Sequence, residues 1–278
     1  MTVATKFVKV NHSLRNSNGQ IFLPPWVRKD VLNLHVPDEA ALFTQEVDQN
    51  YPIGAKLITF EDTYRYCKAG AAMSQVGFLK CNYTLVPGKA GNSANQGFEG
   101  AFYAAVAAGD TSFQIADTAA VENEYEGALL VLYNDTTNRY DQYRILGNDV
   151  TNATTTTLYI APPGFKTLAA TSVGITIYLN RYANVRPFST GGGYASAIGA
   201  ARMAITSAYF FWLKTAGPTS GLTGASTWPG QTQYYRDVFC NTDGSVITYN
   251  AGYQRVGFLL GRTASDYGDN CIMLQLDQ

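Results

Sequence analysis

Residues that could carry out chemistry are few and scattered in this sequence. Its two histidines, His12 and His35, both lie near the N-terminus, far along the chain from any serine or cysteine in a nucleophile-like setting. A catalytic triad needs a histidine that a carboxylate orients and that contacts the nucleophile. The G-x-S-x-G motif of hydrolases is also missing. We therefore predict no catalytic residue, no cofactor and no enzymatic activity.

Two groups of acidic residues suggest oxygen ligands for a metal ion. Glu122, Glu124 and Glu126 alternate, so an extended strand would place all three on one face, where they could hold Ca²⁺. A solvated acidic edge is the preferred interpretation, because charges keep strand edges from pairing wrongly. The polar stretch 266–270 offers further oxygens, and a polar turn is preferred there. We predict no metal site.

The four cysteines do not form a recognisable metal or redox motif. None belongs to a C-x-x-C pair, and none has a second ligand at the spacing of a zinc site. Buried, reduced thiols are the expected state, because small apolar thiols pack well in a core. The cysteines are Cys67, Cys81, Cys240 and Cys271.

Composition points to a protein that buries surface in an assembly. Of 278 residues, only 15% are charged, 13% are aromatic and 19 are tyrosine. Tyrosine favours interfaces, where one end of the ring is apolar and the other polar. A net charge of −1 and the lack of a basic patch make nucleic acid an unexpected direct partner. No apolar run is long enough to span a membrane, and no secretory signal is present, so we expect synthesis in the cytoplasm of the producing cell.

Strand patterns dominate the chain. The segments 56–60 and 63–68 alternate polar with apolar or aromatic residues, which is the period-2 signature of half-buried antiparallel strands. Residues 127–133 form a continuous apolar run that predicts a buried strand. Residues 195–206 are rich in alanine, and periodicity does not decide between a helical turn and a strand. The fold class is predicted to be mainly β: an antiparallel sandwich or barrel domain with a second, inserted β domain.

Two glycine-rich stretches, 86–97 and 189–193, mark the predicted domain boundaries. They divide the chain after the first 36 residues into residues 37–95, 96–185 and 186–278. Gly217 and Pro218 are predicted to end the strong strand 208–214.

Residues 1–36 are predicted to form an extended N-terminal arm. The apolar segment 21–27 contains Pro24 and Pro25, which are unsuited to a central strand. Such a segment must dock, either on its own domain or on a neighbouring subunit. We predict an interface formed by Phe22, Pro24, Pro25 and Trp26, with the prolines keeping the arm extended.

Three stretches resemble structural proteins of tailed-bacteriophage heads. They are YPIG…TYRYCKAGAA…GFL, then TSFQIADTAA…GALLVLYNDTTNRYDQYRILGND…YIAPPG, then AYFFWLKTAGPTSGL…AGYQRVGFLLGRTASDYGDNCIMLQL, and together they cover most of residues 51–276. The resemblance is to the β-rich decoration or auxiliary proteins of the capsid. It implies one discontinuous main β domain, with residues 37–95 as its first part and residues 186–278 as its second, and residues 96–185 as a β domain inserted between them. It also implies a virion protein on the capsid surface, made in the host cytoplasm, with the major capsid protein and copies of itself as partners. By analogy with a capsid threefold axis, a homotrimer is expected.

Two alternatives remain open from the sequence. The chain could be another virion part, such as the major capsid protein, a head fibre or a tail component. A major capsid protein of the common phage fold would need a long amphipathic spine helix, and none is evident. The chain could instead be a carbohydrate-binding β-sandwich module that uses Trp212, Trp228, Tyr234 and Tyr235 as stacking surfaces.

Overall fold

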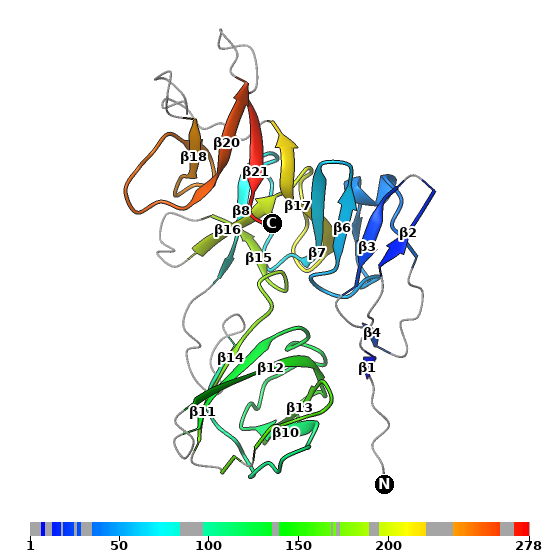
Figure 1. The fold of residues 1–278 in the computed structure, drawn as a ribbon, viewed down its shortest axis with the longest axis vertical. Helices are drawn as coiled ribbons and strands as arrows, with labels where there is room; N and C mark the ends of the chain where they lie inside the picture. Colours follow the sequence, from blue (N-terminus) through cyan, green and yellow to red (C-terminus); the bar gives the residue numbers. More distant parts are fainter. Residues whose placement is uncertain are drawn as a thin grey trace. The chain divides into compact units, whose positions relative to one another are not determined.

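The protein is almost entirely β in the computed structural model (Figure 1). The structure describes residues 7–8, 13–17, 19–24, 27–28, 35–83, 97–134, 139–167, 169–170, 173–188, 195–220, 236–261 and 270–277. Within these ranges no α-helix occurs, and one 3₁₀ turn, η1, spans Ala40–Phe43. The prediction of a mainly β, antiparallel fold is therefore confirmed.

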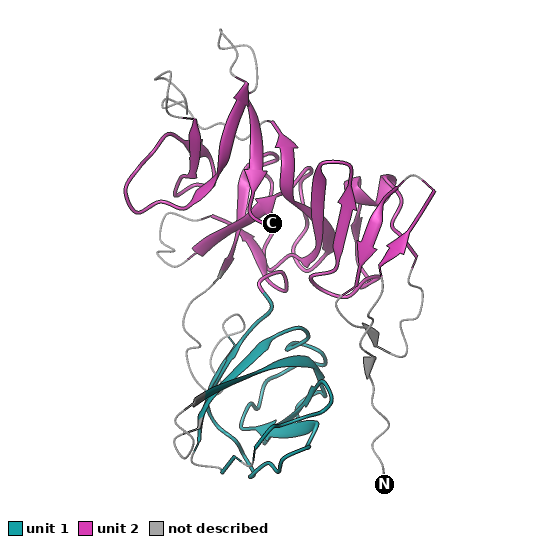
Figure 2. Ribbon diagram, in the orientation of Figure 1, with its two compact units in different colours: residues 1–9, 26–30, 85–180 teal, residues 10–25, 31–84, 181–278 magenta. Residues whose placement is uncertain are grey.

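The chain divides into two compact units (Figure 2). Unit 1 contains residues 1–9, 26–30 and 85–180, and unit 2 contains residues 10–25, 31–84 and 181–278. The long stretch of unit 1 overlaps the predicted inserted domain, and the segments around it in sequence come together in unit 2. Residues 10–25 of the predicted arm belong to unit 2 as well. A short pair of strands, β1 (Phe7–Val8) and β4 (Val27–Arg28), completes the N-terminal region.

Unit 1 is built on a six-stranded antiparallel sheet with the order β10-β13-β12-β11-β14-β9. Its two edges meet, because Phe102 bridges Ile115 and the Tyr103 N–H donates to the Gln114 carbonyl at 2.8 Å. The sheet thus curls into a barrel-like shape, which removes exposed strand edges. The strands are β9 (Phe98–Ala101), β10 (Ser112–Ile115), β11 (Leu129–Asn134), β12 (Arg139–Asn148), β13 (Thr156–Ile160) and β14 (Gly174–Tyr178).

Alternation along these strands builds the core of unit 1. In β13, for example, Thr156, Leu158 and Ile160 point inward and are buried, while the residues between them are half-buried. Successive side chains of a strand point to opposite faces, so one face of each strand lines the interior. Three phenylalanines pack edge to face there, with ring centroids 5.5–5.6 Å apart, namely Phe102, Phe113 and Phe165.

Unit 2 contains the larger sheet, with the main strand order β19-β18-β20-β21-β17-β7-β6-β3-β2. The path runs through β2 (Leu14–Arg15), β3 (Ile21–Leu23), β6 (Lys56–Thr59), β7 (Asp62–Lys68), β17 (Phe210–Thr219), β18 (Asp237–Cys240), β19 (Val246–Ile247), β20 (Arg255–Gly261) and β21 (Cys271–Gln275). The strands beside this path are β5 (Gln45–Glu46), β8 (Leu79–Tyr83), β15 (Val185–Pro187) and β16 (Ala195–Ala200).

The long strand β17 joins the two halves of this sheet. Its first part pairs with β7, and its last four residues pair with β21. The switch occurs where Gly217 adopts φ +106°, a conformation that side-chain-bearing residues rarely adopt. The prediction that Gly217 and Pro218 end the strand is wrong, because the strand continues through both to Thr219.

Unit 2 also decides two points that the sequence left open. The alanine-rich segment 195–206 begins as strand β16 and not as a helical turn. Of the two placements expected for the N-terminal arm, residues 14–23 dock on their own unit, where β2 and β3 are hydrogen-bonded into the sheet and β3 pairs with β6. A tight turn, in which the Gly19 N–H donates to the Asn16 carbonyl, joins β2 to β3, and Phe22 of β3 is buried against Tyr51. These two short strands therefore add to the edge of the sheet.

Candidate functional site

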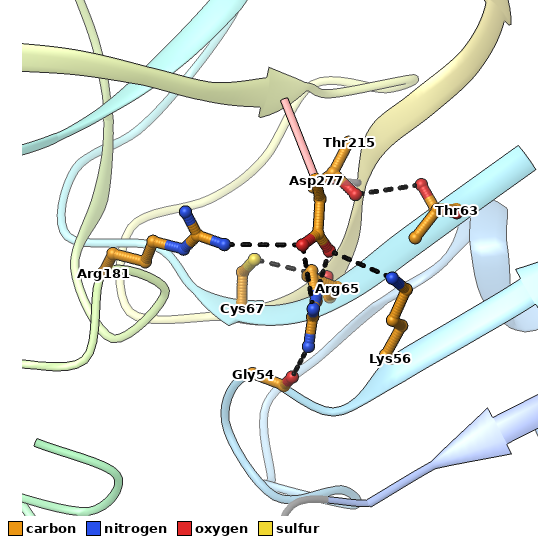
Figure 3. Close-up of polar contacts among 8 residues, drawn as sticks. All are labelled: Gly54, Lys56, Thr63, Arg65, Cys67, Arg181, Thr215 and Asp277. Atoms are coloured by element: carbon orange, nitrogen blue, oxygen red, sulfur yellow. Dashed lines mark hydrogen bonds and ion pairs between the residues drawn. The ribbon is translucent and has the colours of Figure 1, made fainter. Parts of the chain in front are cut away.

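A buried carboxylate near the C-terminus gathers three cationic side chains in unit 2 (Figure 3). Asp277 has a side chain only 7% exposed, and the Arg65 guanidinium binds it through two nitrogens. Arg65 Nη2 lies 2.9 Å from Asp277 Oδ1. Lys56 Nζ and Arg181 Nη2 lie 3.9 and 3.5 Å from its oxygens. This two-pronged geometry is the strong form of an arginine–carboxylate contact.

The strand order explains why these residues meet. Lys56 and Arg65 are directly paired across β6 and β7, so their side chains leave the same face of the sheet. The Leu276 N–H donates to the Thr215 carbonyl at 3.0 Å, which fixes the chain next to Asp277. The remaining guanidinium nitrogen of Arg65 donates to the Gly54 carbonyl at 2.8 Å. The cluster therefore ties the end of β21 to the β6–β7 pair.

Electrostatics keep this cluster ionised. Burial alone would raise the pKa of Asp277, but the hydrogen bond and charge of Arg65, with the charges of Lys56 and Arg181, outweigh burial and hold that pKa below its ordinary value. The carboxylate and the guanidinium consequently stay charged through neutral pH. Such a pair holds strands together and is not suited to accept or release a proton during a reaction.

A second series of polar contacts in unit 2 centres on Asp62, the first residue of β7. Buried Lys214 on β17 pairs with Asp62, with Nζ 2.7 Å from Oδ1. The other oxygen of Asp62 accepts from the Tyr64 hydroxyl at 3.0 Å, and Arg202 Nη1 donates to that hydroxyl at 3.0 Å. Burial, followed by the charge of Asp62, raises the pKa of Tyr64 to about 12. The tyrosine therefore remains a neutral donor in this chain.

His35 belongs to an aromatic cluster and not to a catalytic arrangement. Its Nε2 lies 3.1 Å from the Tyr51 hydroxyl, and Tyr51 packs edge to face on Tyr66 with centroids 5.2 Å apart. The Tyr66 hydroxyl donates to Glu46 at 2.6 Å. Burial, the largest cause, raises the pKa of Tyr51 to about 12. His12 lies outside the described residues.

The predicted interface residues divide between the core and the undescribed part of the chain. Phe22 is 0% exposed and packs on Tyr51 and Trp212, with centroids 5.5 and 6.3 Å apart. Pro24 is buried, and Pro25 and Trp26 lie outside the described residues. Phe22 thus contributes to the core of its own unit, and its buried side chain does not contact a neighbouring subunit.

The predicted acidic edge takes a different form. Residues 122–127 lie in consecutive turns rather than in a strand, so the three glutamates do not share one face. Glu122 is exposed, Glu126 is buried, and Glu124 accepts from the Val121 N–H at 3.1 Å. Asn270 is buried, whereas Asp266 and Asp269 lie outside the described residues. Over the ranges that the structure describes, no group of three or more potential metal ligands is found.

Most of the cysteines, and the one described residue of the predicted sugar-stacking surface, have buried side chains. All four cysteines are free, and all but Cys271 are buried. Burial raises the pKa of Cys81 to about 11 and that of Cys240 to about 12, so these thiols are unreactive. Trp212 is only 3% exposed and cannot stack on a sugar. The other aromatic residues proposed for that role, Trp228, Tyr234 and Tyr235, lie outside the described residues.

Phe60 is an exposed aromatic residue that sequence reasoning missed. It lies in the two-residue turn between β6 and β7, where Thr59 pairs with Asp62. Its φ is +47°, and it is fully exposed at 101% of its reference area. Glycine, asparagine or aspartate normally occupies this conformation, and a bulky residue there is an outlier. The sequence pattern places Phe60 at the end of the predicted strand 56–60, whereas the structure places it in the turn, because β7 begins at Asp62 and Thr59 is the last residue of β6.

No described helix has the length and apolar character that crossing a membrane requires. No protein-family model, curated protein or solved structure matches the chain.

Proposed function

We propose that this chain is a virion structural protein that decorates or cements the capsid of a tailed phage. The proposal is supported by the resemblance of three long stretches to phage head proteins and by a charge content of 15% with 19 tyrosines. Its partners would be the major capsid protein and copies of the chain itself. Many modest contacts, repeated over a shell, add up to strong attachment.

The observation that carries the proposal is Phe60. A fully exposed phenylalanine in a left-handed conformation is unfavourable twice, through its backbone and through its apolar surface. Nothing in the described part of unit 2 covers its ring. A partner with an apolar pocket would bury the ring, and that burial would offset the cost of the left-handed backbone when the two proteins bind. Phe60 is thus the contact that we assign to the capsid shell.

The buried charge cluster suits the same role. A cementing protein must keep its shape while the shell resists the pressure of packaged DNA. The Asp277 cluster fixes the end of β21 to β6 and β7, the two strands that present Phe60. Ion pairs that are buried and hydrogen-bonded on several sides resist local opening better than exposed ones.

Co-sedimentation with capsid shells tests the proposal. Shells assembled from the major capsid protein of the same phage, without this chain, are mixed with purified wild-type protein and pelleted. We expect saturable binding, and we expect Phe60→Asn to weaken it about tenfold or more, as loss of an interface anchor does. Tyr249→Ser is the matched control, because Tyr249 is another exposed aromatic residue of unit 2, at 65%.

Asparagine tolerates the left-handed conformation, so Phe60→Asn should also stabilise the isolated chain by about 1 kcal/mol. Loss of binding with unchanged or higher stability separates contact from misfolding. Wild-type protein that does not sediment with shells would remove the capsid proposal. Equal binding by wild type and Phe60→Asn would remove Phe60 as the contact and leave the capsid proposal without its structural observation.

A further inference from the structure

The outer face of the unit 1 sheet carries an unusual row of side chains. Tyr133 on β11 pairs directly with Tyr140 on β12, and their rings lie 5.0 Å apart. The two side chains are 42% and 71% exposed. Continuing the register of β11 and β14 by one residue places Gly174 next to Tyr133, and Gly174 pairs with Ala101 on β9. One row across the four strands β12, β11, β14 and β9 therefore has two large side chains followed by two small residues. In that order the residues are Tyr140, Tyr133, Gly174 and Ala101.

Space above the small half of this row is open. A Cβ atom built on Gly174 meets no other atom within 4 Å. In many sheets an aromatic side chain covers a neighbouring glycine. The ring of Tyr133 contacts Tyr140 on the side away from Gly174. The row thus has a raised half at Tyr133 and Tyr140 and a lower half formed by Gly174, where the space is open, and the small, half-buried Ala101.

Strand β11 carries apolar residues on this outer face, between the exposed Gln142 and Arg144 of β12 on one side and Glu99 of β9 on the other. Leu130 and Leu132 point into the core, yet the outward residues Leu129 and Val131 are also apolar and only half-buried. An antiparallel strand with one face in water normally alternates apolar with polar residues. Continuous apolar sequence is expected where both faces are buried. This is why residues 127–133 predict a buried strand from sequence, although one face is exposed in the single chain.

We propose that a second copy of this chain covers the face, through a twofold contact between two unit 1 sheets. The twofold axis runs parallel to the strands and lies in the plane between the two faces. That operation places Tyr133 and Tyr140 of one copy over Gly174 and Ala101 of the other, and the reverse contact forms at the same time. A twofold interface must be complementary to itself, and a row that is half raised and half open meets this requirement.

The size of the face sets the strength of the contact. Four strands about 4.8 Å apart and five residues of about 3.4 Å each give a footprint of roughly 300 Å². Stable dimers bury about 800 Å² of accessible surface on each partner. The contact is therefore weak in solution, with a dissociation constant above about 10 µM. Copies held close together on a surface would form it far more readily.

Sedimentation velocity of the full chain, from about 10 to about 500 µM, tests the contact. We expect the weight-average mass to rise with concentration from one chain toward two. Gly174→Lys should abolish the rise without unfolding the chain, because the position has open space and an ordinary φ. Gly261→Lys is the matched control, because Gly261 is likewise an exposed strand glycine with nothing within 4 Å.

Exchanging the large and small positions gives a stricter test. Gly174→Tyr alone should block association, because two tyrosines would then meet. Adding Tyr133→Gly should restore association, since each new tyrosine would face a new glycine of the partner. A wild-type mass that stays at one chain throughout, or self-association that Gly174→Lys leaves unchanged, would overturn the proposal. Neither result bears on shell binding through Phe60, which lies in the other unit.

Discussion

Removing the charge of Asp277 should destabilise the protein strongly. Asp277→Asn keeps the shape of the side chain but leaves Arg65 and Lys56, whose side chains are 21% and 18% exposed, without their counter-charge. Breaking a fully buried ion pair from one side costs about 3–5 kcal/mol. Partial exposure of both cations and the one acceptor oxygen that asparagine retains reduce this to about 2–3 kcal/mol.

Thermal unfolding measures this loss directly. For a unit of this size, 1 kcal/mol lowers the midpoint Tm by about 2–4 °C, so Asp277→Asn should lower it by about 4–12 °C. Asp237→Asn is the matched control, because the Asp237–Arg255 pair has a comparable distance of 2.9 Å but is 57% and 46% exposed. Exposed pairs contribute about 0–1 kcal/mol, so this variant should shift Tm by no more than about 4 °C.

The pH dependence gives a second measurement with a defined sign. The folded-state pKa of Asp277 is held below its ordinary value, so the folded protein keeps this charge to lower pH than the unfolded chain does. Its stabilising contribution is complete above the unfolded pKa of about 3.9 and is lost as pH falls through the folded pKa. The difference in Tm between wild type and Asp277→Asn should therefore shrink below about pH 4. Equal effects of Asp277→Asn and Asp237→Asn at neutral pH would show that the buried cluster does not stabilise unit 2.

Three further predictions follow from backbone strain, buried hydrogen bonding and thiol burial. Gly217→Ala should destabilise unit 2 by about 2 kcal/mol or more in denaturant unfolding, because φ is +106° and the new Cβ would lie 2.3 Å from Asp62 Oδ1. Tyr125→Phe should cost about 1.5–3 kcal/mol, because the buried hydroxyl donates to the buried Asp117 carboxylate at 2.5 Å. A fast-reacting thiol reagent at pH 8 should label at most Cys271 in the native chain and all four cysteines in denaturant.

Local patterns carried much of the fold information. Alternation in the sequence TYRYCK predicts the strand β7, because this signal depends on a few adjacent residues. The glycine-rich stretches predict a division of the chain that resembles the two compact units. These features need no knowledge of strand order.

Features that depend on distant contacts could not be predicted. Arg65 and Asp277 are 212 residues apart and meet only because β17 lies between β7 and β21. Strand β17 continues past Gly217 and Pro218 because its partner changes there from β7 to β21, a change that leaves proline outside the pairing with β7. An apolar residue such as Phe22 is expected both in a strand docked on its own unit and in an extended arm that contacts a neighbouring subunit, so the sequence does not decide between them. Only the pocket formed by Tyr51 and Trp212 decides between these two placements.

Several residues of this protein have an unfavourable backbone conformation, a buried charge or an exposed aromatic ring. Whether the chain itself compensates for such a feature distinguishes residues that stabilise the fold from candidate contact residues. The positive φ of Gly217 occurs at a glycine, the residue type that tolerates it best. The buried charge of Asp277 is neutralised by cations of the same unit. Both departures are compensated inside the chain, so they need no partner. Phe60 and the row from Tyr140 to Ala101 are different, because Phe60 combines a strained backbone with a fully exposed ring, and the row sets two exposed rings beside the open space at Gly174. Uncompensated departures are expected where a protein meets something else, which is why the two proposed contacts lie at these positions.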